Sequence, residues 1–275
     1  MMQITPAAER TVRRVRHETK RRLLQVRDVS RLTPKMVRIV LAGDELAGFV
    51  SAAHDDHVKL FFPPPGTEQP VLPAQGPNGP VYPEGAVRPA ARDYTPRRYD
   101  AAAGTLAVDF VLHGDGPATA WAAHARPGHF LGVGGPRGSF IVPDDFDWYL
   151  LAGDETALPA IARRLEELPA GTRAIAVIEV ADAAEEQPLA SRARLDTSWL
   201  HRDGAPPGET SLLLDAIAAL ALPPGEGYAW VAAEAATAKS LRAHLVEARS
   251  LRKDRVKAAA YWKRGAVAVH ETYDD

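Results

Sequence analysis

Residues 91–99 read Ala91-Arg92-Asp93-Tyr94-Thr95-Pro96-Arg97-Arg98-Tyr99 and contain the pattern Arg-x-Tyr-Thr-x-Arg. We expect this stretch to be a strand and the rest of the chain to be organised around it. Successive side chains of a strand point to opposite faces. Arg92 and Tyr94 should therefore share one face, while Asp93, Thr95 and Arg97 share the other.

The residue types in this pattern suit a ligand that combines phosphates with a flat ring. An arginine donates to two oxygens of a pyrophosphate at once, and a tyrosine ring stacks on an aromatic ligand. The Thr95 hydroxyl or its backbone N–H can reach a nitrogen of such a ring. The pattern indicates a flavin site, but an edge strand with solvated arginines and a core tyrosine would carry the same residues.

A second group of motifs follows along the chain. The strand Val108-Asp109-Phe110-Val111-Leu112-His113-Gly114 leads to Gly116-Pro117-Ala118-Thr119-Ala120-Trp121-Ala122. Proline favours the first turn of a helix, and unpaired N–H groups at a helix start can hold a phosphate. A glycine-rich turn, Gly134-Gly135-Pro136-Arg137-Gly138-Ser139, comes after the next predicted strand.

The order of these motifs resembles the siderophore-interacting proteins, which are FAD-dependent ferric-siderophore reductases within the ferredoxin reductase superfamily. Later stretches are similar too: Gly153-Asp154-Glu155-Thr156-Ala157-Leu158-Pro159-Ala160, Trp199-Leu200-His201-Arg202 and Tyr261-Trp262-Lys263-Arg264-Gly265. The resemblance extends from about Leu24 to Gly265. Each motif alone is modest evidence, whereas five in order make coincidence an unsatisfactory explanation.

The composition limits the classes of function. The 275 residues are 46% hydrophobic and 25% charged, which is typical of a globular protein, and the net charge of −2 argues against nucleic acid as the main partner. No run of eighteen apolar residues predicts a membrane span, and no apolar signal region opens the chain, so we expect a cytoplasmic protein. Without cysteine, disulfides, thiolate zinc sites and cysteine-ligated iron–sulfur clusters are excluded.

Two domains are predicted. Residues 1–145 contain many short alternating stretches and one helix, which favours an antiparallel β-barrel; the resemblance implies that it has six strands and binds FAD. Residues 146–275 alternate strands with helices and predict a Rossmann-like parallel sheet that binds NAD(P)H. We expect residues 10–22 to form a solvated, partly frayed basic arm, residues 63–90 a long loop, and Ala258–Tyr261 the last strand.

The resemblance carries the FAD site onto a defined set of residues. In the first domain these are Arg92, Tyr94, Thr95, Arg97, Asp109, Val111, His113, Gly116, Ala118, Thr119 and Trp121. Two of them have ordinary structural explanations as well. His113 could close a strand by hydrogen-bonding backbone, and Trp121 could belong to the core.

The second domain should hold the nicotinamide cofactor. Gly153 lets backbone approach a pyrophosphate, and a helix starting near Thr156 points N–H groups toward it. We include Asp154 and Glu155 in this site, although the turn could be an ordinary one. Trp262 could cover the flavin ring or simply pack. Two acidic residues near the end of the second predicted strand, Glu179 and Asp182, favour the ribose hydroxyl of NADH, while the family uses NADH or NADPH.

Four basic positions resemble those that relatives direct at an anionic ferric siderophore: Lys59, Arg137, Lys263 and Arg264. Each could equally be a solvated surface charge. No metal site and no protein general base is expected, because the flavin carries the redox chemistry. We expect a monomer that neither inserts into membranes nor binds nucleic acid.

The sequence thus predicts a relay in which NAD(P)H reduces FAD and FAD reduces Fe(III) held by a siderophore. Fe(II) binds hard oxygen ligands less well, so reduction releases the iron. Two alternatives use the same architecture. One is a general NAD(P)H:flavin oxidoreductase with another acceptor, and the other is a non-catalytic siderophore-binding flavoprotein.

Overall fold

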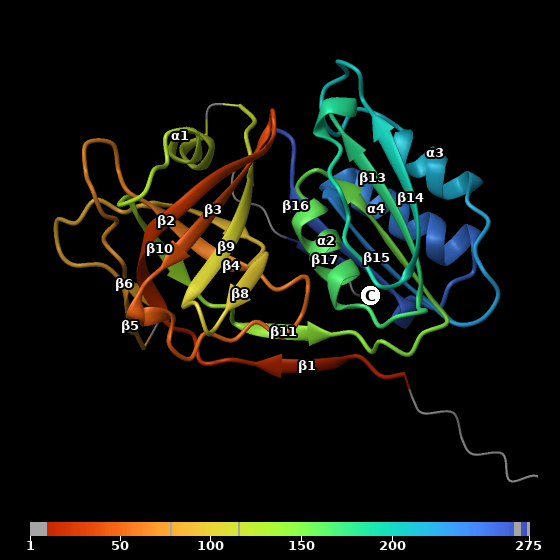
Figure 1. The fold of residues 1–275 in the computed structure, drawn as a ribbon, viewed down its shortest axis with the longest axis horizontal. Coiled ribbons are helices and arrows are strands. Elements are labelled where there is room, and N and C mark those ends of the chain that lie inside the picture. The colour runs from red at the N-terminus through yellow and green to blue at the C-terminus, as the bar shows by residue number, and fades with distance from the viewer. Residues whose placement is uncertain (1–9, 78, 115, 267–270, 274–275) are drawn as a thin grey trace, which may run out of the picture.

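A computed structural model describes residues 10–77, 79–114, 116–266 and 271–273 of the chain. It contains two lobes, each built on its own sheet, which lie side by side in Figure 1. The red-to-yellow lobe carries the antiparallel sheet, and the green-to-blue lobe carries the parallel one. The predicted boundary at 145/146 falls in the connection between these sheets and stays a prediction.

The first lobe is a curled antiparallel sheet of seven strands in the order β7-β4-β10-β2-β3-β9-β8. The strands are β2 (Arg21–Thr33), β3 (Met36–Ala42), β4 (Val58–Phe62), β7 (Ala90–Tyr94), β8 (Arg98–Asp100), β9 (Thr105–Val111) and β10 (Phe130–Gly134). The edge strands β7 and β8 are consecutive in the chain, so residues 90–100 pair with β4 at one end and β9 at the other. This one stretch closes the sheet into the predicted barrel, and the break at Pro96 divides its sixth strand in two.

The barrel forms because alternate residues of these strands are apolar and point inward. In β3, for example, Val37, Ile39 and Leu41 are buried in the core. Helix α1 (Pro117–Ala123) adds Ala118 and Ala122 to the same core. Its position places the turn that precedes it beside the end of β9.

The second lobe is a sheet of six strands in the order β14-β13-β12-β15-β16-β17. All neighbours are parallel except the last pair. The strands are β12 (Trp148–Asp154), β13 (Arg173–Val180), β14 (Arg194–His201), β15 (Gly227–Glu234), β16 (Val256–Trp262) and β17 (Glu271–Tyr273). The strand β17 was not expected, and it makes the prediction of Ala258–Tyr261 as the last strand wrong.

Helices cover both faces of this sheet, as crossover connections require. Helix α2 (Leu158–Glu167) packs with one cluster of buried residues, and α3 (Leu212–Ala219) and α4 (Ala235–Ala243) pack with the other. A π-helical turn, His244–Ala248, continues α4. The central strands are therefore buried on both faces, which explains their continuous apolar runs.

The basic arm is a strand rather than a frayed segment. Strand β1 (Arg13–Arg16) pairs antiparallel with β11 (Gly138–Ile141), and the pair runs beneath both lobes in Figure 1. The side chains of all four β1 residues are exposed, so they give no apolar alternation from which a strand could be predicted. The strand exists because its backbone pairs with a segment that is distant in the sequence. The predicted loop at 63–90 also contains a short hairpin, β5 (Ala74–Gly76) with β6 (Gly79–Val81).

Polar contacts join the lobes along their seam. Lys257 on β16 pairs with Asp55 of the first lobe at 2.6 Å, and both side chains are nearly buried. The Glu185 carboxylate accepts from the Thr33 hydroxyl at 2.6 Å and from a backbone N–H at 2.9 Å. Arg163 of α2 donates to the Ser51 hydroxyl at 2.7 Å. These contacts fix the two lobes against each other.

Candidate functional site

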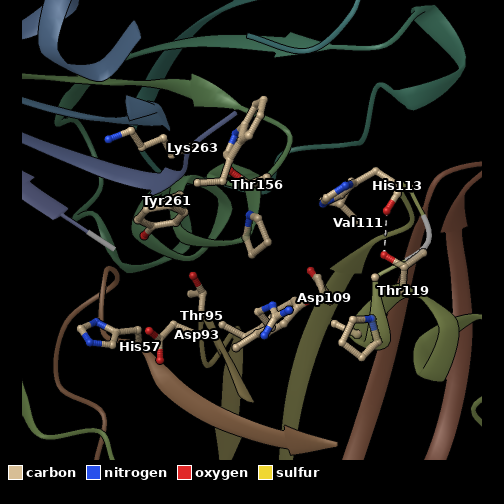
Figure 2. Close-up of a pocket in the computed structure, with 18 of the residues that line it drawn as sticks. His57, Asp93, Thr95, Asp109, Val111, His113, Thr119, Thr156, Tyr261 and Lys263 are labelled. Carbon is tan, nitrogen blue, oxygen red and sulfur yellow. Dashed lines mark hydrogen bonds between the residues drawn. The ribbon is translucent and has the colours of Figure 1, made fainter. Parts of the chain in front are cut away.

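A cavity of roughly 350 Å³ lies between the two lobes. Its first-lobe lining comes from β7, from the end of β9 and from the turn that starts α1. Its second-lobe lining comes from the start of α2 and the end of β16. Figure 2 shows Thr95, Asp93 and His57 facing Tyr261 across this space, with His113 and Thr119 at one side. The lining includes Arg92, Asp93, Tyr94, Thr95, Asp109, Val111, His113, Gly116, Ala118, Thr119, Thr156, Tyr261, Trp262 and Lys263.

Arg92 supplies the cavity with a positive charge. Its guanidinium is half-buried and donates to the Ala91 carbonyl at 2.8 Å. Within the described part of the chain, no carboxylate forms an ion pair with it. A half-buried cation without an acidic partner is suited to bind an anion, because its remaining donors are still available.

Tyr94 is the last residue of β7, and Thr95 follows it directly. The Tyr94 ring packs on Phe110 with centroids 4.5 Å apart. Burial raises the pKa of Tyr94, so its hydroxyl stays neutral at physiological pH. Thr95 is buried and forms a side-chain hydrogen bond with Tyr261 of the second lobe. This bond spans the seam at the floor of the cavity.

The turn before α1 is held by its own polar groups. The Thr119 hydroxyl donates to the His113 carbonyl at 2.8 Å, the bond drawn in Figure 2. The contact brings the end of β9 against the first turn of the helix. Gly116 and Ala118 thereby line the cavity together with His113, as predicted.

Asp109 lines the cavity, but arginines of the barrel engage its carboxylate. Arg38 binds both oxygens, at 2.7 and 2.8 Å, and this hydrogen bond raises the pKa of Arg38. Arg97 stands 3.8 Å away and pairs with Glu166 of α2. Arg97 is buried and lies outside the cavity lining, so the structure gives it a role in joining the lobes.

Four other predicted cofactor residues lie outside the lining, and three of them have packing or pairing roles. Trp121 packs on Phe62 and Phe110, with ring centroids 5.8 and 5.9 Å apart. Gly153 sits where a Cβ would come within 2.1 Å of the Ala232 carbonyl oxygen. Glu155 binds the buried Arg202 guanidinium at 2.5 Å. Each residue has a packing or pairing role that explains its identity, and its contact with a cofactor stays a prediction.

Asp154 is buried at the end of β12 and also lies outside the lining. Its carboxylate instead accepts hydrogen bonds from two residues that do line the cavity. The Trp262 indole N–H donates to it at 2.8 Å, and the Thr156 backbone N–H at 2.9 Å. Burial, and then the charge of Glu155, raise the pKa of Asp154 to about 6.

The comparisons with known proteins agree with this geometry. Residues 25–140 match the family model described as the siderophore-interacting FAD-binding domain, and residues 146–265 match that of the siderophore-interacting protein. The NADPH-dependent ferric-chelate reductase of Escherichia coli is 40% identical, over 90% of this chain and 95% of its own length. The ferric vibriobactin reductase ViuB of Vibrio cholerae is 33% identical, over 87% of this chain and 89% of its own.

This chain belongs to the siderophore-interacting protein family. A crystal structure of a siderophore utilization protein from T. fusca superposes with a TM-score of 0.87 at 45% identity. That match covers 94% of this chain and 98% of the other. The family assignment confirms the predicted resemblance and fold class.

The cavity residues fit the FAD that the family implies. Arg92 offers donors without a competing acid among the described residues. The neutral Tyr94 lies on the same strand, and Thr95 follows the end of that strand. The backbone of 116–118 lines the same cavity. The donor set therefore combines groups for a pyrophosphate with apolar surface for a flat ring.

The acidic residues that favoured NADH are engaged elsewhere. Glu179 is buried and accepts from Thr210 at 2.8 Å and from Arg202 at 3.3 Å. Asp182 accepts from the Ala184 backbone N–H at 2.9 Å. Glu179 is thus buried with two protein donors, whereas Asp182 is half-buried and keeps acceptor capacity on its second oxygen, so the preference for NADH stays a prediction.

The four predicted substrate residues differ in their surroundings. Lys59 pairs with Asp93 at 2.7 Å, and Arg264 pairs with Glu209 at 3.1 Å. Lys263 is exposed and lines the cavity, as Figure 2 shows. Arg137 is exposed in the turn before β11 and lies outside the lining. Of the four, only Lys263 reaches the cavity.

Sequence reasoning missed several lining residues, among them His57, Asp93, Gly114, Pro117, Pro159, Tyr261 and Ala266. A signal existed for two of them. Asp93 shares a predicted face with Thr95, and Tyr261 stands beside Trp262 in the quoted motif. His57 had no such signal, because its place depends on the pairing of β4 with β7.

Two further findings concern what the described residues lack. None of their helices is long and apolar enough to cross a membrane. They also hold no group of three or more histidine, aspartate or glutamate residues that could bind a metal ion.

Proposed function

We propose that this chain is an FAD-containing, NAD(P)H-dependent reductase of ferric siderophores. The observation that carries the proposal is the cavity to which both lobes contribute, with Arg92 on one side and Tyr261 and Lys263 on the other. A relay needs the electron donor, the flavin and the acceptor to meet at one place. A seam between a barrel and a parallel sheet provides such a place.

FAD would be held by the first lobe. Arg92 and the backbone of 116–118 would bind its phosphates, and Tyr94 and Thr95 would contact its ring. When bound, FAD accepts a hydride from a nicotinamide and passes electrons on singly, which couples a two-electron donor to Fe(III). The protein needs no general base for this chemistry, and its own contribution is binding and orientation.

The ferric siderophore is the substrate in this proposal. Lys263 would draw an anionic chelate to the mouth of the cavity, with Arg137 as a second exposed charge. Lys59 and Arg264 are partly neutralised by their acidic partners and would contribute less. Reduction converts the iron to Fe(II), which hard oxygen ligands hold less tightly, so the metal leaves the chelate.

We propose NADPH as the preferred donor. The relative that is 40% identical is named as NADPH-dependent. The carboxylates expected to select NADH are already hydrogen-bonded within the protein. Because the reduced nicotinamide is a cytoplasmic metabolite, a cytoplasmic location belongs to the same proposal, as does the monomeric state, which light scattering would test.

An anaerobic absorbance experiment tests the function. The purified protein should be yellow, and NADPH should bleach it faster than NADH at equal concentration. Adding a ferric siderophore should restore the colour, and a colorimetric chelator should detect Fe(II). Bleaching without Fe(II) would favour a general flavin oxidoreductase, and absence of bleaching would favour a non-catalytic siderophore-binding flavoprotein.

A further inference from the structure

One buried carboxylate organises the second-lobe side of the cavity. Oδ2 of Asp154 accepts from the Trp262 indole N–H at 2.8 Å and from the Glu234 backbone N–H at 3.2 Å. Oδ1 accepts from the backbone N–H and the hydroxyl of Thr156, at 2.9 and 2.5 Å. Four donors on two oxygens leave little capacity for a ligand. Asp154 is therefore placed to orient its neighbours rather than to touch a cofactor.

The Trp262 ring is held from a second side as well. A Cβ added to Gly208 would lie 3.0 Å from the far end of the indole and 2.9 Å from the Glu234 side chain. The backbone at Gly208 has a φ of +71°, a conformation that suits glycine. The ring thus lies between this glycine and its anchor on Asp154, with one surface toward the cavity.

We infer that Asp154 is a positioning residue that fixes Trp262 and Thr156 as the wall against which the reduced nicotinamide is oriented. The inference rests on the proposed function for the identity of the ligand. The anchor itself, meaning the hydrogen bonds from Trp262 and Thr156 to Asp154, lies within the chain and does not depend on the proposed function. Small displacements of positioning groups cost large factors in rate, so the anchor matters for hydride transfer more than for FAD binding.

The surroundings of Asp154 make the anchor sensitive to pH. Glu155 follows it in the chain and disfavours its charge, and Tyr261 faces it from β16. The Glu234 carboxylate on β15 is occupied by backbone N–H groups of α4 and by that of Arg264. Since the pKa of Asp154 is raised to about 6, the carboxylate accepts fully from Trp262 above that pH and weakens as an acceptor below it.

Fluorine NMR tests the anchor without any catalytic measurement. The chain has five tryptophans, so 5-fluorotryptophan labelling should give five resonances, and Trp262→Phe identifies one of them. In the purified protein, with and without added FAD, that resonance should titrate near pH 6 and should shift in Asp154→Asn. Asp182 lies at the same edge of the sheet, so Asp182→Asn is a matched control and should leave the Trp262 resonance unchanged.

Stopped-flow reduction of the flavin by NADPH tests the consequence. Asp154→Asn and Trp262→Phe should each lower the limiting reduction rate by about tenfold, with a smaller change in the dissociation constant of FAD. The double variant should be no slower than Asp154→Asn alone, because Trp262 acts through its bond to Asp154 and the two losses are then not additive. In the native chain the rate should fall below about pH 6. This dependence should disappear in Asp154→Asn and weaken in Trp262→Phe, where the bonds from Thr156 to Asp154 remain.

The outcomes separate the anchor from the proposed function. A Trp262 resonance that neither titrates nor shifts in Asp154→Asn would overturn the anchor, even in a working reductase. Additive rate losses would also overturn it. If Asp154→Asn fails to fold, a Trp262→Phe variant that keeps the native rate and pH profile would also overturn the anchor. If the resonance shifts as expected but NADPH does not reduce the flavin, the anchor is supported and the proposed function is refuted.

Discussion

Removal of the Arg92 guanidinium is the most direct test of the FAD site. The side chain is half-buried at the cavity and makes one hydrogen bond, to the carbonyl of the preceding residue. Truncation to alanine removes no ion pair within the part of the chain that the structure describes. We therefore expect Arg92→Ala to leave the fold intact and to weaken the binding of FAD.

The expected loss follows from the kind of contact that disappears. A hydrogen bond to a charged group contributes roughly 1.5–3 kcal/mol. Since about 1.4 kcal/mol corresponds to a factor of ten in affinity, the dissociation constant of FAD should rise roughly ten- to hundredfold. Arg92→Lys keeps the charge without the planar fork, so its loss should be intermediate.

Titration of the FAD-depleted protein, followed by quenching of flavin fluorescence, measures this constant. Arg98→Ala is the matched control, because Arg98 is exposed on β8 and lies outside the cavity lining. Its FAD affinity should equal that of the native chain. Urea unfolding of both variants should show native midpoints, which excludes a general loss of structure.

An unchanged FAD affinity in Arg92→Ala, with the fold intact, would refute the assignment of Arg92 to the pyrophosphate. An equal loss in Arg98→Ala would refute it in another way, because it would show a diffuse electrostatic effect. In either case the cavity would need another group to balance the phosphate charge. Among the described residues that line it, Lys263 would then be the next to test.

Three further predictions concern the seam, the sheet and the substrate. Lys257→Met should destabilise the protein by about 3–5 kcal/mol at pH 7 in urea unfolding, because it leaves Asp55 buried without a partner. Burial raises the pKa of Asp55 but Lys257 holds it below its ordinary value, so this contribution is present at neutral pH and is lost as the pH falls below about 4. Gly153→Val should lower the unfolding midpoint, and not merely slow flavin reduction, because its Cβ would overlap a carbonyl of β15; a native midpoint would contradict this. Lys263→Ala should slow reduction of an anionic ferric chelate more than Arg264→Ala, with the difference shrinking at high salt; equal rates would leave Lys263 as solvated surface.

The sequence predicted the fold well where periodicity alone decides it. The alternation in residues 36–42 and the apolar runs of 148–154 and 227–234 follow from burial on one face or on two. Strands β1 and β17 escaped because their existence depends on backbone pairing with partners distant in sequence. Exposed arginines in β1 resemble a solvated arm until the partner strand is known.

The part of the candidate site that could be predicted from the sequence is the part contributed by β7 and the residue after it. Arg92 and Tyr94 reach the cavity from β7, and Thr95 reaches it from the position directly after that strand. Arg97 belongs to the same motif but lies beyond Pro96, where the chain leaves β7 to pair with β9. Its guanidinium consequently meets Glu166 of the second lobe.

Arg92 and Arg97 of the motif therefore have different roles, which the sequence pattern alone does not distinguish. Arg92 has no acidic partner among the described residues, and its charge is available to a ligand. Arg97 is buried between Asp109 and Glu166, and its ion pair with Glu166 joins the barrel to the second lobe. A buried cation requires such partners, whereas a cation without an acidic partner keeps its donors for a ligand. Which arginine has an acidic partner depends on the positions of acidic residues from distant segments, such as Glu166. The motif therefore identified the cavity but could not show which of the two arginines lines it.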